Sequence, residues 1–289
     1  MKIASNKIKD ILRFFRDELK DAYPSEELDS IITYCFEDYL HLKRSAISTN
    51  QETTVSESEL LKFNDAIKEL KKFKPLQYIL GEANFYGLKF YVNEHVLIPR
   101  PETEELVHFI IHDNKMNAPA ILDIGTGSGC IPIALKKNIP SAVVSSIDVS
   151  EKALNVANRN AKKNDVEILF ILRDILDPLA ILDQQLLKYD IIVSNPPYIC
   201  NAEKNKMDKN VLDYEPHLAL FVNDNDPLLF YNVICDFALK MLKTNGKLYF
   251  EINQSLASET KDLLESKGFK NVELIKDLSN NYRILRSNS

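Results

Sequence analysis

A four-residue turn, Asn195–Tyr198, combines groups that could hold a planar NH2 group. The Asn195 side-chain carbonyl and the Pro196 backbone carbonyl can each accept an N–H hydrogen bond. Pro196 and Pro197 fix φ and remove two N–H donors, so the turn is stiff and rich in acceptors. The ring of Tyr198 offers a flat face on which a planar group can stack. The turn therefore predicts a pocket for an amide or an aromatic amine.

A glycine turn further upstream indicates a ligand that approaches the backbone closely. Its spacing, Gly-x-Gly-x-Gly, differs from the Gly-x-Gly-x-x-Gly of a dinucleotide site, and no lysine directly follows the last glycine as in a P-loop. Asp148 ends the next apolar run, where it could accept hydrogen bonds from ribose hydroxyls. Together they predict a nucleoside cofactor beside the amine-accepting pocket. The turn consists of Gly125, Thr126, Gly127, Ser128 and Gly129.

Strands must bring these motifs to one edge of a sheet. Apolar runs end at or just before Gly125, Asp148 and Asn195, and open α/β folds bind ligands at the carboxyl ends of their strands. From about residue 100 onward such runs alternate with helical patterns, which is typical of a parallel sheet. We predict strands at 120–124, 143–148, 167–172, 189–194 and 247–252, closed by a pair at 272–277 and 282–286.

The first 80 residues carry apolar stripes at helical spacing and no group suited to catalysis. One stripe covers Ile8–Leu19 and another Leu28–Leu42, and Ser56 with Glu59 has the spacing of a capping box that opens a third helix. Residues 84–92 alternate in hydrophobicity, as a β-hairpin connector would. We predict a helical bundle over 1–83, a hairpin linker over 84–99 and a catalytic domain over 100–289.

The composition fits a cytoplasmic enzyme. Of 289 residues, 45% are hydrophobic, but no apolar stretch reaches the length of a membrane span or of a signal-peptide core. The net charge of −6 argues against broad binding to a phosphate backbone, and the four cysteines lie too far apart for a zinc site. His108 and His112 have the spacing of a metal pair but lack the glutamate of His-Glu-x-x-His, so we predict no metal.

With these motifs the chain resembles the class I S-adenosylmethionine-dependent methyltransferases, and most closely the bacterial release factor glutamine N5-methyltransferases. Three further segments carry the resemblance: Pro75–Gly81, Leu97–Glu105 with Pro-Arg-Pro-Glu-Thr-Glu, and Tyr214–Leu220 with Tyr-Glu-Pro-His. The resemblance implies a Rossmann-like seven-stranded α/β sheet with an antiparallel end, joined by a β-hairpin to an N-terminal helical bundle. It implies S-adenosylmethionine as cofactor. It also implies methylation of the glutamine in the Gly-Gly-Gln loop of class I peptide chain release factors.

The resemblance also assigns roles to the predicted residues. Asn195, Pro196 and Tyr198 would act in catalysis and, with Pro197, bind the glutamine side chain. The cofactor would contact the glycine turn, Asp148, Asn195 and Ile175. Because a three-residue loop offers little surface, the enzyme needs a second contact region, and the helical bundle is the candidate for it.

Three places depart from the family pattern. Asn223–Asp226 stands where glycines are usual, Asn253 replaces the glycine of Glu-Ile-Gly, and Ile175 stands where some members carry an aromatic residue against the adenine. Arg100 and Thr103 are candidates to orient the methionyl end of the cofactor. A salt bridge with a neighbouring glutamate or a helix cap explains these two residues equally well.

Two rival functions use the same motifs. The pocket also suits N6 of adenine or N2 of guanine, but a nucleic-acid methyltransferase would need a basic surface and stacking residues. A catalytically idle adapter that keeps the cofactor fold is hard to reconcile with an intact Asn-Pro-Pro-Tyr turn. The acidic balance and the two specific segments favour the glutamine enzyme, with no membrane and no direct nucleic-acid substrate expected.

Overall fold

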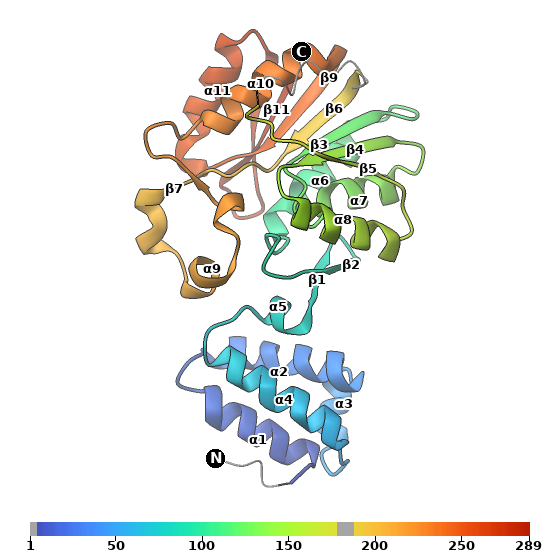
Figure 1. Cartoon of the computed structure of the whole chain (residues 1–289), viewed down its shortest axis with the longest axis vertical. Helices are drawn as coiled ribbons and strands as arrows, with labels where there is room; N and C mark the ends of the chain where they lie inside the picture. The colour runs from blue at the N-terminus through green and yellow to red at the C-terminus, as the bar shows by residue number, and fades with distance from the viewer. Residues whose placement is uncertain (1–4, 178–187) are drawn as a thin grey trace. The chain divides into compact units, whose positions relative to one another are not determined.

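The computed structural model describes residues 5–177 and 188–289, which form two compact units (Figure 1). The first unit contains the chain up to Gly81 together with Lys209–Tyr214. The second contains Glu82–Asp208 and Glu215–Ser289. The membership of Lys209–Tyr214 in the first unit is a tertiary feature for which the sequence pattern gives no signal. No helix in the described ranges combines the length and the apolar composition needed to cross a membrane.

The first unit is a helical bundle. Its aromatic core includes Phe15, Phe36 and Phe63, all fully buried. The predicted capping box is confirmed, because the Glu59 amide donates to Ser56 Oγ at 3.3 Å and the Ser56 amide donates to Glu59 Oε2 at 2.7 Å. Its helices are α1 (Ile8–Leu19), α2 (Ser25–Leu40), α3 (Arg44–Thr49), α4 (Glu57–Leu70), α5 (Leu76–Leu80) and α9 (Lys209–Tyr214).

The second unit opens with the predicted hairpin, formed by β1 (Glu82–Phe85) and β2 (Leu88–Tyr91) in antiparallel pairing. The hairpin starts two residues earlier than the sequence pattern indicated. Gly81 explains the early start, since it ends α5 in the left-handed conformation (φ 68°) and frees the next residue to pair.

A seven-stranded sheet forms the centre of the second unit, in the order β10-β11-β9-β6-β3-β4-β5. The five strands from β9 to β5 in this order are parallel, and β11 runs antiparallel between β9 and β10, so the predicted sheet class is confirmed. β5 is shorter than predicted and β9 begins earlier. The strands are β3 (Ala120–Ile124), β4 (Val143–Asp148), β5 (Leu169–Leu172), β6 (Tyr189–Ser194), β9 (Leu242–Glu251), β10 (Lys270–Lys276) and β11 (Tyr282–Asn288).

Helices cover both faces of this sheet (Figure 1). α6 (Pro101–Asp113), α7 (Cys130–Asn138) and α8 (Glu151–Lys163) pack on one face, and α10 (Leu229–Met241) and α11 (Ala257–Ser266) pack on the other. Successive residues of a strand point to opposite faces of the sheet. They therefore contribute in turn to the hydrophobic core under α6, α7 and α8 and to the core under α10 and α11. The segment that follows β6 contains a short parallel pair of strands, β7 (Ile199–Cys200) and β8 (Phe221–Val222).

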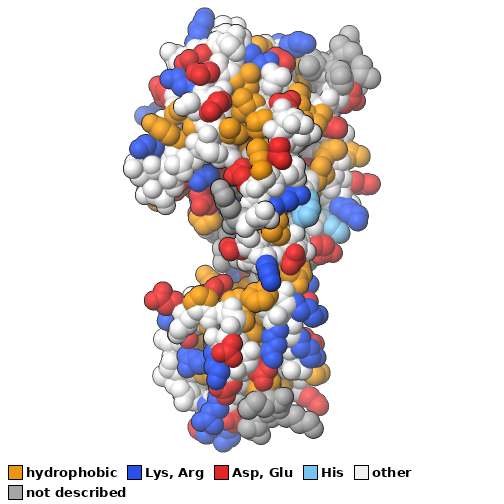
Figure 2. Space-filling model, turned by 90° about the vertical axis from the view of Figure 1, so that its left-hand side faces the viewer, with side chains coloured by type: hydrophobic (Ala, Val, Ile, Leu, Met, Phe, Trp, Pro, Cys, Tyr) orange, Lys and Arg blue, Asp and Glu red, His pale blue; other side chains and the backbone are white. Residues whose placement is uncertain are grey.

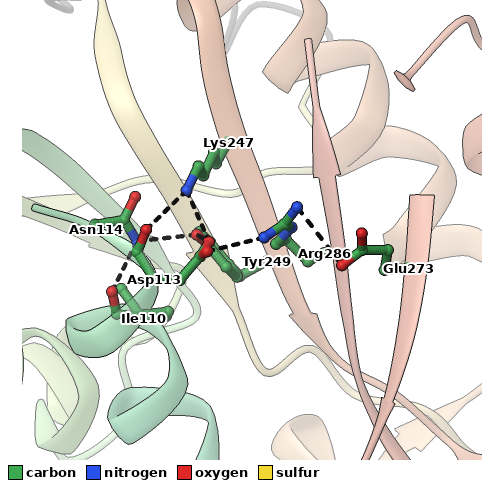
Figure 3. Close-up of polar contacts among 7 residues, drawn as sticks. All are labelled: Ile110, Asp113, Asn114, Lys247, Tyr249, Glu273 and Arg286. Atoms are coloured by element: carbon green, nitrogen blue, oxygen red, sulfur yellow. Dashed lines mark hydrogen bonds and ion pairs between the residues drawn. The ribbon is translucent and has the colours of Figure 1, made fainter. Parts of the chain in front are cut away.

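The carboxyl end of α6 is fixed to β9 and β11 by a polar cluster (Figure 3). Asp113 Oδ2 accepts from Lys247 Nζ at 2.8 Å and from the Tyr249 hydroxyl at 2.5 Å. Its other oxygen accepts from Arg286 Nη1 at 2.8 Å. Lys247, Tyr249 and Glu251 alternate along β9, so all three side chains leave the strand on the face that α6 covers.

Candidate active site

A cavity of about 230 Å³ lies at the carboxyl edge of the parallel strands. Its lining includes Gly125 after β3, Asp148 at the end of β4, Ile175 after β5 and Asn195 after β6. In the sheet, β4 and β5 lie on one side of β3, and β6 and β9 lie on the other. The strand order therefore reverses at β3. Open α/β sheets bind their ligands at such a point.

The three glycines of the turn differ in surroundings. Gly125 and Gly127 line the cavity at φ 80° and 52°, and a Cβ atom on either would meet nothing within 4 Å. Both therefore leave backbone open for a ligand to approach. Gly129 is not among the lining residues; a Cβ there would come within 3.1 Å of Ala157 on α8, so it serves helix packing.

Asp148 supports the glycine turn as well as facing the cavity. Its Oδ2 accepts from the Gly127 amide at 2.9 Å, and its Oδ1 accepts from the Ser150 amide at 2.8 Å. Burial raises the pKa of this carboxyl, and the backbone donors oppose that rise. Each carboxylate oxygen has a second lone pair, so the group can still accept from a ligand hydroxyl.

The Asn195 carboxamide reaches a buried carboxylate through one hydroxyl. Asn195 Nδ2 donates to Thr103 Oγ1 at 3.2 Å, and Thr103 Oγ1 donates to Glu251 Oε2 at 2.6 Å. The Tyr198 hydroxyl donates to the other oxygen, Glu251 Oε1, at 3.1 Å. Burial raises the pKa of Glu251, while the Thr103 hydroxyl and the charge of Arg283 oppose that rise. Each oxygen of the Glu251 carboxylate thus accepts a hydrogen bond from a hydroxyl group.

The Pro-Arg-Pro-Glu and Tyr-Glu-Pro-His segments meet in an ion pair between a half-buried arginine and a buried glutamate. Arg100 Nη2 donates to Glu215 Oε1 at 2.5 Å, and the Ile98 amide donates to Glu215 Oε2 at 3.1 Å. The side chain of Glu215 is 2% exposed, whereas Arg100 lines the cavity. Glu215 therefore holds the strand-to-helix loop at residues 98–100 against the site.

Most residues predicted for the site share one cavity, and the two exceptions are informative. Tyr198 is not among the lining residues; its ring packs against the core and its hydroxyl binds Glu251. Gly129 packs against α8, as described above. Arg100 and Thr103 also line the cavity. The predicted residues that line it are Gly125, Thr126, Gly127, Ser128, Asp148, Ile175, Asn195, Pro196 and Pro197.

Two of the three departures from the family pattern have local structural roles, whereas the third, Ile175, lines the cavity. Asn253 Oδ1 accepts from the Ser255 amide at 3.0 Å, and its Nδ2 donates to the Tyr198 carbonyl at 3.3 Å. Asn223 Oδ1 accepts from the Asn225 amide at 3.1 Å.

Among the described residues no group of three or more His, Cys, Asp or Glu side chains could hold a metal, and the centroids of the His108 and His112 rings lie 3.9 Å apart.

Two acidic residues of the site carried no predicted role. Glu251 ends β9 directly after the apolar run Leu248–Phe250, and a lone carboxylate in such a position is a signal that could have indicated a buried network. Glu215 belongs to a segment quoted for the resemblance, but nothing in the sequence pairs it with Arg100, since 115 positions separate them.

Comparison with known proteins defines first a class and then a family. A protein-family model described as "Methyltransferase small domain" matches residues 104–213, and a second family model, described as "PrmC N-terminal domain", matches residues 10–81. The fold also matches a Thermus thermophilus 16S rRNA N2 G1207 methyltransferase, with a TM-score of 0.52 at 16% identity, covering 72% of this chain and 49% of that one. The second unit thus has the methyltransferase fold.

Two curated relatives make the assignment specific. The release factor glutamine methyltransferase of Flavobacterium psychrophilum is 49% identical over 285 residues, covering 97% of this chain and 99% of that protein. That of Bacteroides thetaiotaomicron is 42% identical, covering 96% and 99%. The chain belongs to the release factor glutamine methyltransferase family, which confirms the resemblance carried by its motifs.

Proposed function

We propose that this chain transfers the methyl group of S-adenosylmethionine to the side-chain amide nitrogen of a release factor glutamine. The target is the glutamine of the Gly-Gly-Gln loop of class I peptide chain release factors, and the reaction takes place in the cytoplasm. The observation that carries the proposal is the Asn195 carboxamide beside a cavity built on the glycine turn, in a chain of this family.

The cavity fits the cofactor. The open space over Gly125 and Gly127 is a cradle that any side chain there would fill. The Asp148 carboxylate can accept from ribose hydroxyls, and Ile175 offers an apolar contact for the adenine. When bound, S-adenosylmethionine supplies a sulfonium methyl that is already strongly electrophilic, so the protein's task lies with the nucleophile.

The amide nitrogen of glutamine is a poor nucleophile because its lone pair is delocalised into the carbonyl. Asn195 Oδ1 and the Pro196 carbonyl are the acceptors for its two N–H groups, and Pro197 keeps the turn stiff. These fixed dipoles orient the nitrogen and stabilise the positive charge that develops on it. Transfer breaks the S–CH3 bond and leaves a positive charge on the methylated amide nitrogen. This cation is strongly acidic and loses a proton to water, so the step needs no general base beside Asn195.

Binding of the cofactor has a direct test. Gly127→Val places a side chain in the cradle and strains a position at φ 52°, so isothermal titration should show greatly weakened binding of S-adenosylmethionine. Asp148→Ala should also weaken binding, partly because the Gly127 amide loses its acceptor. Unchanged affinity in both variants would place the cofactor elsewhere.

The substrate is tested by incubating the enzyme and S-adenosylmethionine with release factors and locating the methyl group by mass spectrometry. We expect a single methylated glutamine in the Gly-Gly-Gln loop. Methylation of duplex or single-stranded DNA with release factors untouched would instead favour the nucleic-acid enzyme. Acidic and basic side chains are interspersed on the face drawn in Figure 2, which offers little support for a nucleic-acid substrate.

We further propose that the helical bundle provides the second contact region for the release factor. A variant should begin at Glu82 and replace Lys209–Tyr214 by a short linker, since that segment belongs to the same compact unit as the bundle. It should bind S-adenosylmethionine and methylate release factors poorly. Loss of cofactor binding would show that the bundle only supports the fold.

A further inference from the structure

We propose that Glu251 and Thr103 are positioning residues that set the orientation of the Asn195 carboxamide, an inference that rests on the function proposed above. The three side chains form one relay: Asn195 Nδ2 to Thr103 Oγ1 at 3.2 Å, then Thr103 Oγ1 to Glu251 Oε2 at 2.6 Å. They come from the loop after β6, the first turn of α6 and the last residue of β9. None of these elements is adjacent in sequence to another.

The direction of the relay follows from the chemistry of its buried end. An ionised carboxylate accepts hydrogen bonds and donates none. The Thr103 hydroxyl has one proton and gives it to Glu251, so its oxygen can only accept from Asn195. Asn195 must therefore turn its NH2 group toward Thr103. Its carbonyl oxygen is then directed away from Thr103 and is free for the N–H of a substrate amide.

Both oxygens of Glu251 are engaged, which fixes the carboxylate in turn. The Tyr198 hydroxyl donates to Oε1 at 3.1 Å, and the positive charge of Arg283 opposes the rise in the pKa of this carboxyl that burial causes. Tyr198 thus contributes to the site through Glu251, which agrees with its absence from the residues that line the cavity. The Asn-Pro-Pro-Tyr turn is held at both ends, at Asn195 through Thr103 and at Tyr198 directly.

A packing role alone explains this arrangement poorly. Thr103 is 3% exposed and Glu251 is 2% exposed, and a buried carboxylate paired with hydroxyls costs folding free energy that apolar side chains would not. The benefit of the buried carboxylate is that, through Thr103, it fixes the orientation of the Asn195 carboxamide. Without the relay the carboxamide can flip, and the flipped form presents NH2 to the NH2 of the substrate. Such misorientation lowers turnover without removing the cofactor cradle.

The test compares two substitutions of Thr103 in the full-length enzyme, one without the hydroxyl and one that keeps it. Thr103→Val removes the hydroxyl and Thr103→Ser keeps it, while Thr260→Val removes a buried hydroxyl of α11 that donates to the carbonyl of Leu256, the residue before this helix. Each is made in the wild type and in the Asn195→Ala variant. Single-turnover methylation of a release factor with radiolabelled S-adenosylmethionine gives the rate, isothermal titration gives cofactor affinity, and thermal unfolding confirms the fold.

We expect Thr103→Val to lower the methylation rate by about 10-fold to 100-fold, as loss of substrate alignment does, with cofactor affinity nearly unchanged. Thr103→Ser should restore most of the rate, and Thr260→Val should not lower it. In the Asn195→Ala background Thr103→Val should have no further effect, because the carboxamide it orients is gone. Glu251→Gln should resemble Thr103→Val; if it fails to fold, the Thr103 pair carries the test.

Two results would overturn the inference: a normal rate for Thr103→Val, or the same fold-loss in the wild-type and Asn195→Ala backgrounds. The second result would mean that Thr103 acts independently of Asn195. A wild-type enzyme that leaves release factors unmethylated overturns the proposed function itself, and the inference falls with it. Wild-type activity with an insensitive Thr103→Val variant overturns the inference alone.

Discussion

The two ends of α6 are attached to the same strand, β9, by carboxylates with opposite surroundings. At the amino end, Glu251 of the strand accepts from Thr103 of the helix at 2.6 Å. At the carboxyl end, Asp113 of the helix accepts from Lys247 of the strand at 2.8 Å (Figure 3). The first carboxylate has hydroxyl donors on both oxygens, whereas the second has a cationic donor on each.

The partners decide the protonation behaviour of each carboxylate. Burial alone would raise the pKa of both. At Asp113 the hydrogen bonds from Lys247 and Tyr249 and the nearby positive charges outweigh burial, and the pKa is lowered. At Glu251 burial outweighs the donors, and the pKa is raised. Folding therefore favours the charged form of Asp113 and the uncharged form of Glu251.

This difference indicates different roles for the two carboxylates: Asp113 anchors α6, and Glu251 orients the Asn195 side chain. Asp113 has a cationic donor on each oxygen, which anchors α6, and its one hydroxyl donor, Tyr249, is not among the residues that line the cavity. A carboxylate that receives hydroxyl protons fixes the direction of every hydrogen bond that leads to it. We infer that the Asp113 end stabilises the fold and the Glu251 end prepares Asn195 for its substrate. Four predictions test that division.

The largest effect is expected at Asn195, where the Glu251 relay ends. Asn195→Ala removes an acceptor that matters most in the transition state, so methylation of a release factor should fall by about 100-fold to 1,000-fold. Isothermal titration should still detect a substantial fraction of the cofactor affinity, because the cradle at Gly125 and Gly127 is intact. Near-normal turnover would refute the proposed mechanism.

The next effect concerns stability at the other end of α6. Asp113→Ala leaves Lys247 and Arg286, each 19% exposed, without their carboxylate and should lower the free energy of unfolding by about 2 to 4 kcal/mol. Turnover of the folded enzyme should stay close to that of the wild type. Urea unfolding measures the first quantity and Asp113→Asn is the milder control. A large loss of turnover at full cofactor affinity would contradict the division of roles.

The dependence of stability on pH should have opposite sign at the two ends. The lowered pKa of Asp113 means that its contribution is present above its ordinary value of 3.8 and is lost as pH falls through the folded pKa. The raised pKa of Glu251 means that its contribution is present below 4.5 and is lost as pH rises through the folded pKa.

Unfolding of both amide variants between about pH 3 and pH 8 measures this contrast. Relative to the wild type, Asp113→Asn should lose stability as pH rises, and Glu251→Gln should gain it. Parallel curves for the two variants would show that their surroundings do not differ as described.

The smallest effect is expected at the edge of the Asp113 cluster. Glu273 lies 3.5 Å from Arg286 Nη2, and its side chain is 54% exposed. An exposed pair contributes little, so Glu273→Ala should change the free energy of unfolding by less than about 0.5 kcal/mol, measured by urea unfolding in moderate salt. A loss comparable to that of Asp113→Ala would mean that the whole cluster acts as one cooperative network.

Much of the fold could be predicted from local sequence. The glycine turn, the capping box at Ser56 and the apolar runs of the central sheet depend on near neighbours and on strand periodicity, and the structure confirms them. The resemblance supplied the family. The bounds of β5 and the early start of β1 were missed, because strand ends depend on pairing partners that the local pattern does not name.

By itself the sequence determined which groups are available: acceptors at Asn195 and Pro196, flexible backbone at Gly127 and an acid at Asp148. Only the tertiary structure decided how they are used. It paired Asn195 with Thr103 across 92 positions and Thr103 with Glu251 across 148, and it turned the Tyr198 hydroxyl toward Glu251. The physical reason is that hydrogen bonds act over about 3 Å, so a relay exists only where packing brings distant segments to that distance.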